Sequence, residues 1–325
     1  MREVNYTQAI NEAVDEEMRR DATIFLFGQD LRALGAPRGE LKGLFEKYGP
    51  ERVIDAPISE TAILGGAIGA AITGMRPVAH IMYANFLGVC GDELINQLTQ
   101  MRYMFGGNIK VPVTIITSSG GGFSAAAHHS KTMHAMLMTV PGLKIIVPST
   151  PYDAKGLLKS AIREDNPTVF LYHQLLMRRG VKSQIPEEDY VIPLGKADVK
   201  REGKDVTVVA TAAMVNRALA VAEGLQKKGI DVEVIDPRTL VPLDKETILK
   251  SVKKTNRLVI IDEEPKIASV ASEIAAMVNE EAFDSLDAPI KRVCAPDTPI
   301  PFSPILEQAW IPSEEKLAAA INELI

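Results

Sequence analysis

Hydrophobic and polar positions divide the chain into two series in which helix-like and strand-like segments alternate. The first series opens with residues 6–20, where Ala9, Ala13 and Met18 recur at helical spacing, and continues with the apolar run 23–27. Further strands are expected at 53–54, 77–82, 111–117, 143–147 and 168–172, and helices at 60–73, 89–105, 130–138 and 152–163. Several of these strands are uninterrupted Val/Ile runs, which is typical of a parallel sheet with both faces covered.

The alternation breaks over residues 176–200, where Pro, Gly and charges of both signs accumulate. It resumes with strands at 206–210, 232–235, 258–261 and 290–293 and helices at 213–228, 245–254, 270–281 and 313–324. The pattern therefore predicts an α/β protein of two parallel-sheet domains, residues 1–180 and 201–325, joined by a linker at 181–200.

Length, charge and cysteine content narrow the class of protein. The 325 residues suffice for two domains. The 36 Lys and Arg residues against 42 Asp and Glu give a net charge of −6 without a basic block, so we expect neither a nucleic acid nor an anionic membrane as partner. Residues 1–21 are amphipathic and rich in acids and lack the apolar core of a signal peptide, and no apolar run approaches the roughly 18 residues of a membrane span. Cys90 and Cys294 suggest neither a disulfide framework nor metal ligands, which favours a reducing, cytoplasmic location.

Common cofactor motifs are absent from the sequence. There is no GxxxxGK[ST] phosphate loop and no GxGxxG after the first strand, so a nucleotide site of either type is not supported. The small residues at 65–71 fall inside a predicted helix, where they favour close helix packing over ligand binding. The five histidines lack metal-ligand spacing, and no Ser–His–Asp order is recognisable.

One carboxyl group lies where α/β proteins bind their ligands. In the segment 55–61, Pro57 ends the strand, Ser59 can cap the following helix, and Glu60 falls in the first helical turn. One interpretation is structural, an acid placed favourably at the positive end of the helix dipole. The other is functional, a poorly solvated carboxyl at the C-terminal rim of a parallel sheet that shares a proton with a ligand nitrogen. The residues alone leave both interpretations open.

His128 and His129 are the other candidates for chemistry. They follow the small-residue stretch 120–127 at the end of an apolar strand, where there is little core for them to serve. Because histidine titrates near neutral pH, a functional role is favoured for this pair. His134, on a Met-rich helical face, is interpreted as structural.

Several motifs together resemble one enzyme family. They are the run 55–71, Arg76-Pro77, Asn85-Phe86, Asp92, Asn96-Gln97, His129-Ser130, 141–144, 149–158, Asn166-Pro167, 238–244 and 297–301. They span essentially the whole chain and are similar to motifs of the beta subunit of the thiamin-diphosphate-dependent dehydrogenase in 2-oxo acid dehydrogenase complexes. Within that family, residues 102–107 look most like the acetoin dehydrogenase branch.

The resemblance implies a transketolase-like pyrimidine-binding domain followed by a transketolase C-terminal-like domain. It also implies roles for side chains of the first domain. Glu60 matches the glutamate that hydrogen-bonds N1′ of the cofactor's aminopyrimidine, and Phe86 matches the aromatic ring against the pyrimidine face. Met82 matches a position in the same pocket. His129 matches the histidine that faces the reaction centre and serves proton transfer or acyl transfer to a lipoyl group.

The family also implies a structural potassium ion held by backbone carbonyl groups. The matching positions are Val113, Ala161, Ile162, Glu164 and Asn166. Because main-chain oxygens would bind the ion, these side chains neither support nor exclude it.

A missing motif is equally informative. The family holds the cofactor's diphosphate and Mg²⁺ on a separate alpha subunit with a Gly-Asp-Gly motif, whereas this chain has only Gly91-Asp92-Glu93. The resemblance therefore implies half of each active site, an α2β2 heterotetramer that needs its alpha subunit, and a lipoyl acyltransferase core as outer partner. The implied reaction is cleavage or decarboxylation of acetoin or a 2-oxo acid, with transfer of the acyl group to lipoamide.

Some positions depart from the family pattern. His80, Val89 and Lys131 replace residues that are commonly acidic, polar and glutamine, so we expect a substrate other than pyruvate or a weakly active paralogue. Two alternatives stay open. One is half of a split transketolase, disfavoured because Glu60 lies in Ile-Ser-Glu-Thr rather than Ala-Glu-Gln, and the other is a non-catalytic subunit.

Overall fold

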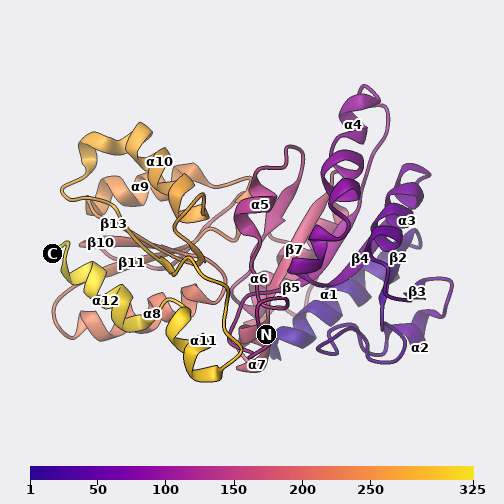
Figure 1. Ribbon diagram of the computed structural model, residues 1–325, viewed down its shortest axis with the longest axis horizontal. Helices are drawn as coiled ribbons and strands as arrows, with labels where there is room; N and C mark the ends of the chain where they lie inside the picture. The colour runs from indigo at the N-terminus through magenta and orange to yellow at the C-terminus, as the bar shows by residue number, and fades with distance from the viewer.

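The computed structural model describes residues 1–325 as two α/β domains that lie side by side (Figure 1). The sheet of the first domain contains β2 (Ile24–Gln29), β3 (Val53–Ala56), β4 (Arg76–Tyr83), β5 (Thr114–Ser119), β6 (Lys144–Ile146), β7 (Thr168–His173) and β12 (Thr239–Val241). The sheet of the second domain contains β9 (Asp198–Arg201), β10 (Val206–Ala210), β11 (Val232–Asp236), β13 (Leu258–Pro265) and β14 (Lys291–Ala295).

Both sheets are parallel apart from one edge strand each. The strand order is β12-β6-β7-β5-β4-β2-β3 in the first sheet and β14-β13-β10-β11-β9 in the second. Within these two sheets, only the pairs β12–β6 and β9–β11 are antiparallel. The predicted fold class of two parallel-sheet α/β domains is therefore confirmed.

Helices cover both faces of the first sheet, as the uninterrupted apolar strands predict. They are α1 (Tyr6–Arg20), α2 (Leu44–Tyr48), α3 (Glu60–Ile72), α4 (Met101–Met104), α5 (His134–Met138), α6 (Pro151–Arg163), α7 (Gln174–Arg178), the 3₁₀ helix η1 (Ala84–Gly88) and the π-helix η2 (Glu93–Leu98). Val78 and Ile116 join the core cluster that contains α1 and α6, whereas their neighbours Ala79 and Ile115 join the cluster that contains α3. Successive strand residues thus point to opposite, equally buried faces.

The second sheet is covered in the same way. Its helices are α8 (Met214–Gln226), α9 (Lys245–Thr255), α10 (Val270–Ala282), η3 (Phe283–Ser285), α11 (Pro304–Trp310) and α12 (Glu314–Asn322). Helices α8 and α12 pack together against one face, and α9 and α10 against the other. No helix of the protein combines the length and the apolar run that crossing a bilayer requires.

Two of the predicted helices are wrong. The helix expected at 89–105 is divided into η2 and α4, and Gly88 and Gly91 lie at the break before η2. The helix expected at 130–138 is reduced to α5, because Met133 takes a left-handed φ of 61° immediately before it.

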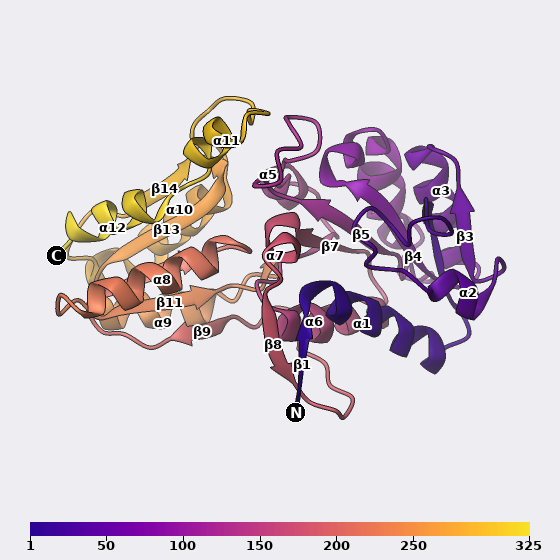
Figure 2. The same ribbon diagram turned by 90° about the horizontal axis from the view of Figure 1, so that it is seen from below.

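The segment 181–200, expected as a linker, contains ordered strands. Its first part forms β8 (Lys182–Ile185), which pairs antiparallel with β1 (Arg2–Asn5) near the N-terminus (Figure 2). Its last residues begin β9, the edge strand of the second sheet. In the opposite direction, β12 leaves the second domain and extends the first sheet by pairing with β6.

Buried charges also join the two domains. Asp153 of α6 accepts hydrogen bonds from Lys200 (2.5 Å) and from Nε of Arg238 (2.8 Å), and Arg238 also reaches Asp198 at 3.0 Å. Ser149 donates to Asp236, whose pKa is raised to about 6 by burial and by the negative charge of Asp153. Residues far apart in the sequence therefore form one buried network at the junction.

Candidate active site

Glu60 is the first residue of α3, directly beyond the carboxyl end of β3. Its side chain is half-buried and makes no hydrogen bond or ion pair within the chain. Ser59 does not cap the helix as predicted, because its hydroxyl donates instead to the carbonyl of Pro57 at 2.9 Å. The carboxylate of Glu60 is thus available to a ligand at the rim of the sheet.

The start of α3 lies against the turn that follows η1. Thr61 donates a hydrogen bond to the carbonyl of Val89 at 3.2 Å, which joins the two segments. Burial raises the pKa of the Cys90 thiol to about 12, and the negative charges of Glu93 and Glu60 contribute to that shift. The thiol therefore stays protonated, and Glu60 lies close enough for its charge to act there.

Three aromatic rings form a cluster at the end of β4. The rings of Tyr83 and Phe86 lie 5.6 Å apart between centroids, and that of His129 lies 4.4 Å from Tyr83 and 5.4 Å from Phe86, all at edge-to-face angles. Phe86 belongs to η1, whereas His129 comes from the loop after β5. The structure therefore brings together two of the residues that the sequence singled out.

Asn85 holds the histidine loop beside η1. Its amide nitrogen donates to the carbonyl of Ala127 at 3.0 Å, and its amide oxygen accepts from the N–H of Lys131 at 3.1 Å. The motif Asn85-Phe86 was recognised in the sequence, but the clamping role of Asn85 was not, because it depends on backbone groups more than 40 residues away.

Carboxylates of the second domain hold the glycine-rich start of the same loop. Glu263 accepts from the N–H of Gly121 at 2.5 Å, and Glu307 accepts from the N–H groups of Gly122 and Ser124 at 2.9 Å each. Both glutamates are at least 97% buried. The loop that carries His129 is therefore positioned by both domains.

The protonation state of His129 follows from its surroundings. Burial lowers the pKa of this imidazole, and the positive charges of His128 and Arg38 lower it further. Its backbone carbonyl accepts from Gln174 at 2.6 Å, which fixes the loop on the side of β7. His129 thus presents a largely neutral imidazole to the aromatic cluster.

The departures from the family pattern fall in different places. His80 is fully buried, with its Nε2 atom 3.4 Å from the hydroxyl of Tyr172 and 3.4 Å from the carboxylate of Glu40. Lys131 lines a cavity at the domain junction, and Val89 is 59% exposed. Met82 is half-buried at the end of β4. His80 therefore belongs to a buried polar cluster with Tyr172 and Glu40, and it adds no charge at the carboxyl end of the sheet.

The five positions matched to a potassium site lie around the start of β5 and the end of α6. Thr168 donates to the carbonyl of Val113 at 3.0 Å, and Thr114 to that of Ala161 at 3.1 Å. Arg76 donates to the carbonyls of Ile162 at 3.1 Å and Glu164 at 2.7 Å. The side chain of Asn166 accepts from Arg102 at 2.6 Å. The carbonyl oxygens of Val113, Ile162 and Glu164 thus already accept one hydrogen bond each, and that of Ala161 accepts a second from the N–H of Glu164 at 3.1 Å. A carbonyl oxygen has two lone pairs.

Family comparisons define the class to which this architecture belongs. The transketolase pyrimidine-binding domain family matches residues 2–179, and the transketolase C-terminal domain family matches residues 195–317. A solved structure described as a split gene transketolase, inactive beta4 tetramer, has a TM-score of 0.81 at 24% identity and covers 99% of this chain and 98% of its own. The protein is thus a transketolase-type molecule in fold.

Sequence relatives specify the branch. The beta subunit of acetoin:2,6-dichlorophenolindophenol oxidoreductase from Bacillus subtilis is 47% identical over 100% of this chain and 98% of its own length. The 2-oxoisovalerate dehydrogenase subunit beta and the pyruvate dehydrogenase E1 component subunit beta of the same organism are 42% and 41% identical, with coverage of at least 98% on both sides. The chain belongs to this family of thiamin-diphosphate-dependent dehydrogenase beta subunits, and the recognition made from its motifs is confirmed.

Proposed function

We propose that Glu60 holds N1′ of the aminopyrimidine of thiamin diphosphate, and that this contact makes the chain the pyrimidine-binding half of an active site. The observation that carries the proposal is the half-buried carboxylate of Glu60, which has no partner within the chain and begins α3 at the carboxyl end of the sheet. Thiamin diphosphate, when bound, supplies a nucleophilic carbon and an electron sink for cleavage of a bond next to a carbonyl group. Glu60 would supply the shared proton.

Three further residues would orient the pyrimidine and serve the reacting groups. Phe86 offers a flat apolar ring, and the half-buried Met82 would fill the same pocket. His129 packs at edge-to-face angles against Tyr83 and Phe86, and its lowered pKa leaves it neutral. A neutral imidazole there would accept and return a proton during acyl transfer.

The other half of the site would come from an alpha subunit. The chain has no Gly-Asp-Gly motif for Mg²⁺ and diphosphate, so we propose that an alpha subunit binds both and that the working assembly is an α2β2 heterotetramer. A lipoyl acyltransferase core would accept the acyl group. Both cysteines are free thiols, which supports the proposed cytoplasmic location.

For the substrate we propose acetoin, with a 2-oxo acid as the second candidate. Relatives named for acetoin are 47% and 46% identical to this chain, against 41% for the B. subtilis relative named for pyruvate.

The structural potassium ion is proposed at the carbonyls of Val113, Ala161, Ile162, Glu164 and Asn166. Oxygen donors of this kind suit a hard cation.

The test is Glu60→Gln in the chain reconstituted with its alpha subunit. Because a glutamine cannot share its proton with N1′, exchange of the C2 proton of bound thiamin diphosphate, followed by NMR in D₂O, should slow by about a hundredfold or more. Glu46→Gln is the matched control, since Glu46 is an exposed acid in the first turn of α2 in the same domain. It should leave the exchange rate unchanged.

Unchanged exchange in the Glu60→Gln complex would overturn the assignment and favour a non-catalytic subunit. Reconstitution also separates the two enzymatic classes. Activity that requires a lipoyl acceptor supports the dehydrogenase, whereas sugar-carbon transfer without any lipoyl group supports a split transketolase. Screening acetoin against 2-oxo acids on the same complex then identifies the substrate.

A further inference from the structure

A second cluster of ionisable groups lies buried where the two domains meet, apart from the carboxylate of Glu60. His134 opens α5 in the first domain, and Asp262 and Glu264 lie on β13 of the second. Their exposed fractions are 1%, 0% and 8%. Two carboxylates are therefore withdrawn from water next to an imidazole, which is costly unless something compensates their charge.

Three atoms of the cluster that could bind a metal ion have no hydrogen-bond partner. Both ring nitrogens of His134 and the Oδ2 atom of Asp262 are buried and make no hydrogen bond. The Nδ1 atom of His134 lies 3.7 Å from Oδ1 of Asp262, which is longer than a hydrogen bond. Two ligands bound to one metal at about 2.1 Å lie about 3.4 Å apart at the tetrahedral angle, and further apart as that angle opens. The separation thus suits a bridging ion better than a direct contact.

We propose that His134, Asp262 and Glu264 form a binding site for a divalent metal ion at the domain junction. One ligand atom from each residue can be chosen so that all of them lie within 4.8 Å of one another. Two carboxylates and a neutral imidazole carry a charge of about −2, which a divalent ion cancels. The mixed nitrogen and oxygen donors suit Zn²⁺ or a similar transition ion better than Ca²⁺ or Mg²⁺, which prefer oxygen alone.

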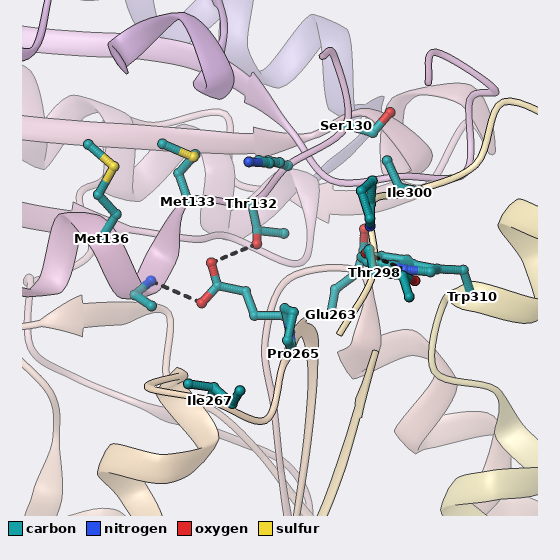
Figure 3. A pocket seen from close by; sticks show the side chains of 14 residues that line it. Ser130, Thr132, Met133, Met136, Glu263, Pro265, Ile267, Thr298, Ile300 and Trp310 are labelled. Atoms are coloured by element: carbon teal, nitrogen blue, oxygen red, sulfur yellow. Dashed lines mark hydrogen bonds between the residues drawn. The ribbon is translucent and has the colours of Figure 1, made fainter. Parts of the chain in front are cut away.

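Neighbouring groups already orient the two carboxylates. Thr211 donates to Oδ1 of Asp262 at 2.8 Å. Thr132 donates to Oε1 of Glu264 at 2.9 Å and the N–H of Ala135 to Oε2 at 2.9 Å, both drawn as dashed lines in Figure 3. Such outer contacts are usual around metal ligands, because they fix the direction of the lone pairs that remain.

The site has a route to solvent. Glu264 lines a cavity of about 270 Å³ at the junction, together with Thr132, Met133 and Met136 (Figure 3). A metal ion could enter through this cavity and keep a water molecule on the cavity side as a further ligand. The apolar side chains of the two methionines would limit exchange with bulk water.

The competing occupant is a proton. His134 is buried beside the two carboxylates of Asp262 and Glu264, and its ring nitrogens have no hydrogen-bond partner. The position therefore attracts positive charge, and an imidazolium without any metal is the alternative that the experiment must exclude. An ion there would join α5 to β13 and so fasten the two domains together.

The experiment uses the full chain, stripped with EDTA and then dialysed against Zn²⁺ or Co²⁺. We expect about one equivalent of zinc per chain by elemental analysis after gel filtration, a higher melting temperature with zinc, and visible absorption bands of Co²⁺ bound to nitrogen and oxygen. His134→Gln and Asp262→Asn should each lose the metal and the shift in melting temperature. Glu273→Gln, an exposed acid on α10, is the matched control and should keep both.

Three results would overturn the proposal. The first is wild-type chain that retains no zinc and shows no Co²⁺ bands. The second is metal retained at the same stoichiometry in His134→Gln and Asp262→Asn. The third is a ¹⁵N NMR spectrum in which the His134 ring is an imidazolium and does not respond to zinc. The first and third use the unaltered chain, so they decide the question even if a variant does not fold.

Discussion

His129 meets the aromatic cluster as a neutral imidazole, and its charge state depends on identified neighbours. Burial lowers its pKa, as do the positive charges of His128 and Arg38. The neutral form is the one that can accept a proton, so activity that depends on it should fall as the pH drops through that lowered pKa.

Replacing the adjacent histidine should move this pH limit. In His128→Gln the repulsion from a neighbouring positive charge is gone, so His129 holds its proton up to a higher pH. The acid limb of kcat/KM for the reconstituted complex should therefore move upward, by a few tenths of a pH unit for an exposed neighbour. The measurement is a pH–rate profile against the wild-type chain. A limb that stays in place, or moves to lower pH, would contradict the assignment of that limb to His129.

Residue types in motifs allowed Glu60, Phe86 and His129 to be selected from the sequence, and the structure places two of them in contact. The supporting residues were not predictable in the same way. Glu307 reaches the loop across 183 residues of sequence to Ser124, and nothing near it in the chain indicates that contact. His80 was noted only as a departure from the family pattern, because its burial against Glu40 depends on how distant segments pack.

The loop 120–131 is the element on which the candidate site depends most. Gly120 has a φ of +80°, and a Cβ atom there would overlap the ring of His173, so only glycine fits. Glu263 and Glu307 then take up the N–H groups that follow it. The second domain thus fixes the conformation of an active-site loop in the first.

Removing the charge of Glu307 should loosen that loop. Glu307→Gln keeps the size of the side chain and one acceptor oxygen, and Oε1 alone reaches the N–H groups of Gly122 and Ser124, at 2.9 and 3.1 Å. The amide NH₂ that replaces Oε2 is a donor facing the N–H of Ser124, so the 2.9 Å bond there is lost at a cost of about 1–3 kcal/mol. We expect kcat to fall by roughly tenfold with a smaller change in KM, since the loop carries His129 rather than the pyrimidine contact.

The readout separates positioning from general instability. Glu307→Asp, which restores the charge on a shorter side chain, should recover part of kcat, and the exposed Glu280→Gln should leave it unchanged. Equal losses in kcat and in folded fraction, without recovery in the aspartate variant, would show that Glu307 serves stability alone.

Elements with strong local patterns were predictable, and elements made by distant contacts were not. The helix at α1 and the strands at β10 and β7 lie within one residue of their predicted bounds, because periodicity and apolar runs define them locally. The breaks near Gly88 and Gly91 and at the left-handed Met133 were not predicted, because the apolar pattern continues across them. The strands β8 and β12 are short, and only their partners make them strands.

At the scale of the whole molecule, the buried charge network at the junction should contribute strongly to stability. Arg238→Met removes the guanidinium that bonds to Asp153, a carboxylate with no exposed surface. Because a buried charge loses part of its compensation, the free energy of unfolding should fall by about 3 kcal/mol, and Lys200 keeps the loss from being larger. Urea unfolding of the full chain, with and without Arg238→Met, measures this change in the free energy of unfolding.

The control for this prediction is an ion pair of the same type in solvent. Lys245→Met breaks a pair with Glu281 in which the lysine side chain is 58% exposed, and it should barely move the urea midpoint. Equal shifts in Arg238→Met and Lys245→Met would show that burial of the junction network adds nothing.

The pairing of β12 with the sheet of the first domain has a consequence for how the protein can be divided into fragments. A fragment ending near residue 200 would keep β6 but lose the strand that covers its free edge. An uncovered strand edge of that kind pairs with strands of other molecules. The isolated first half should therefore aggregate or form domain-swapped oligomers instead of staying monomeric. Engineers who want the two lobes as separate modules would have to carry residues 239–241 along with the first.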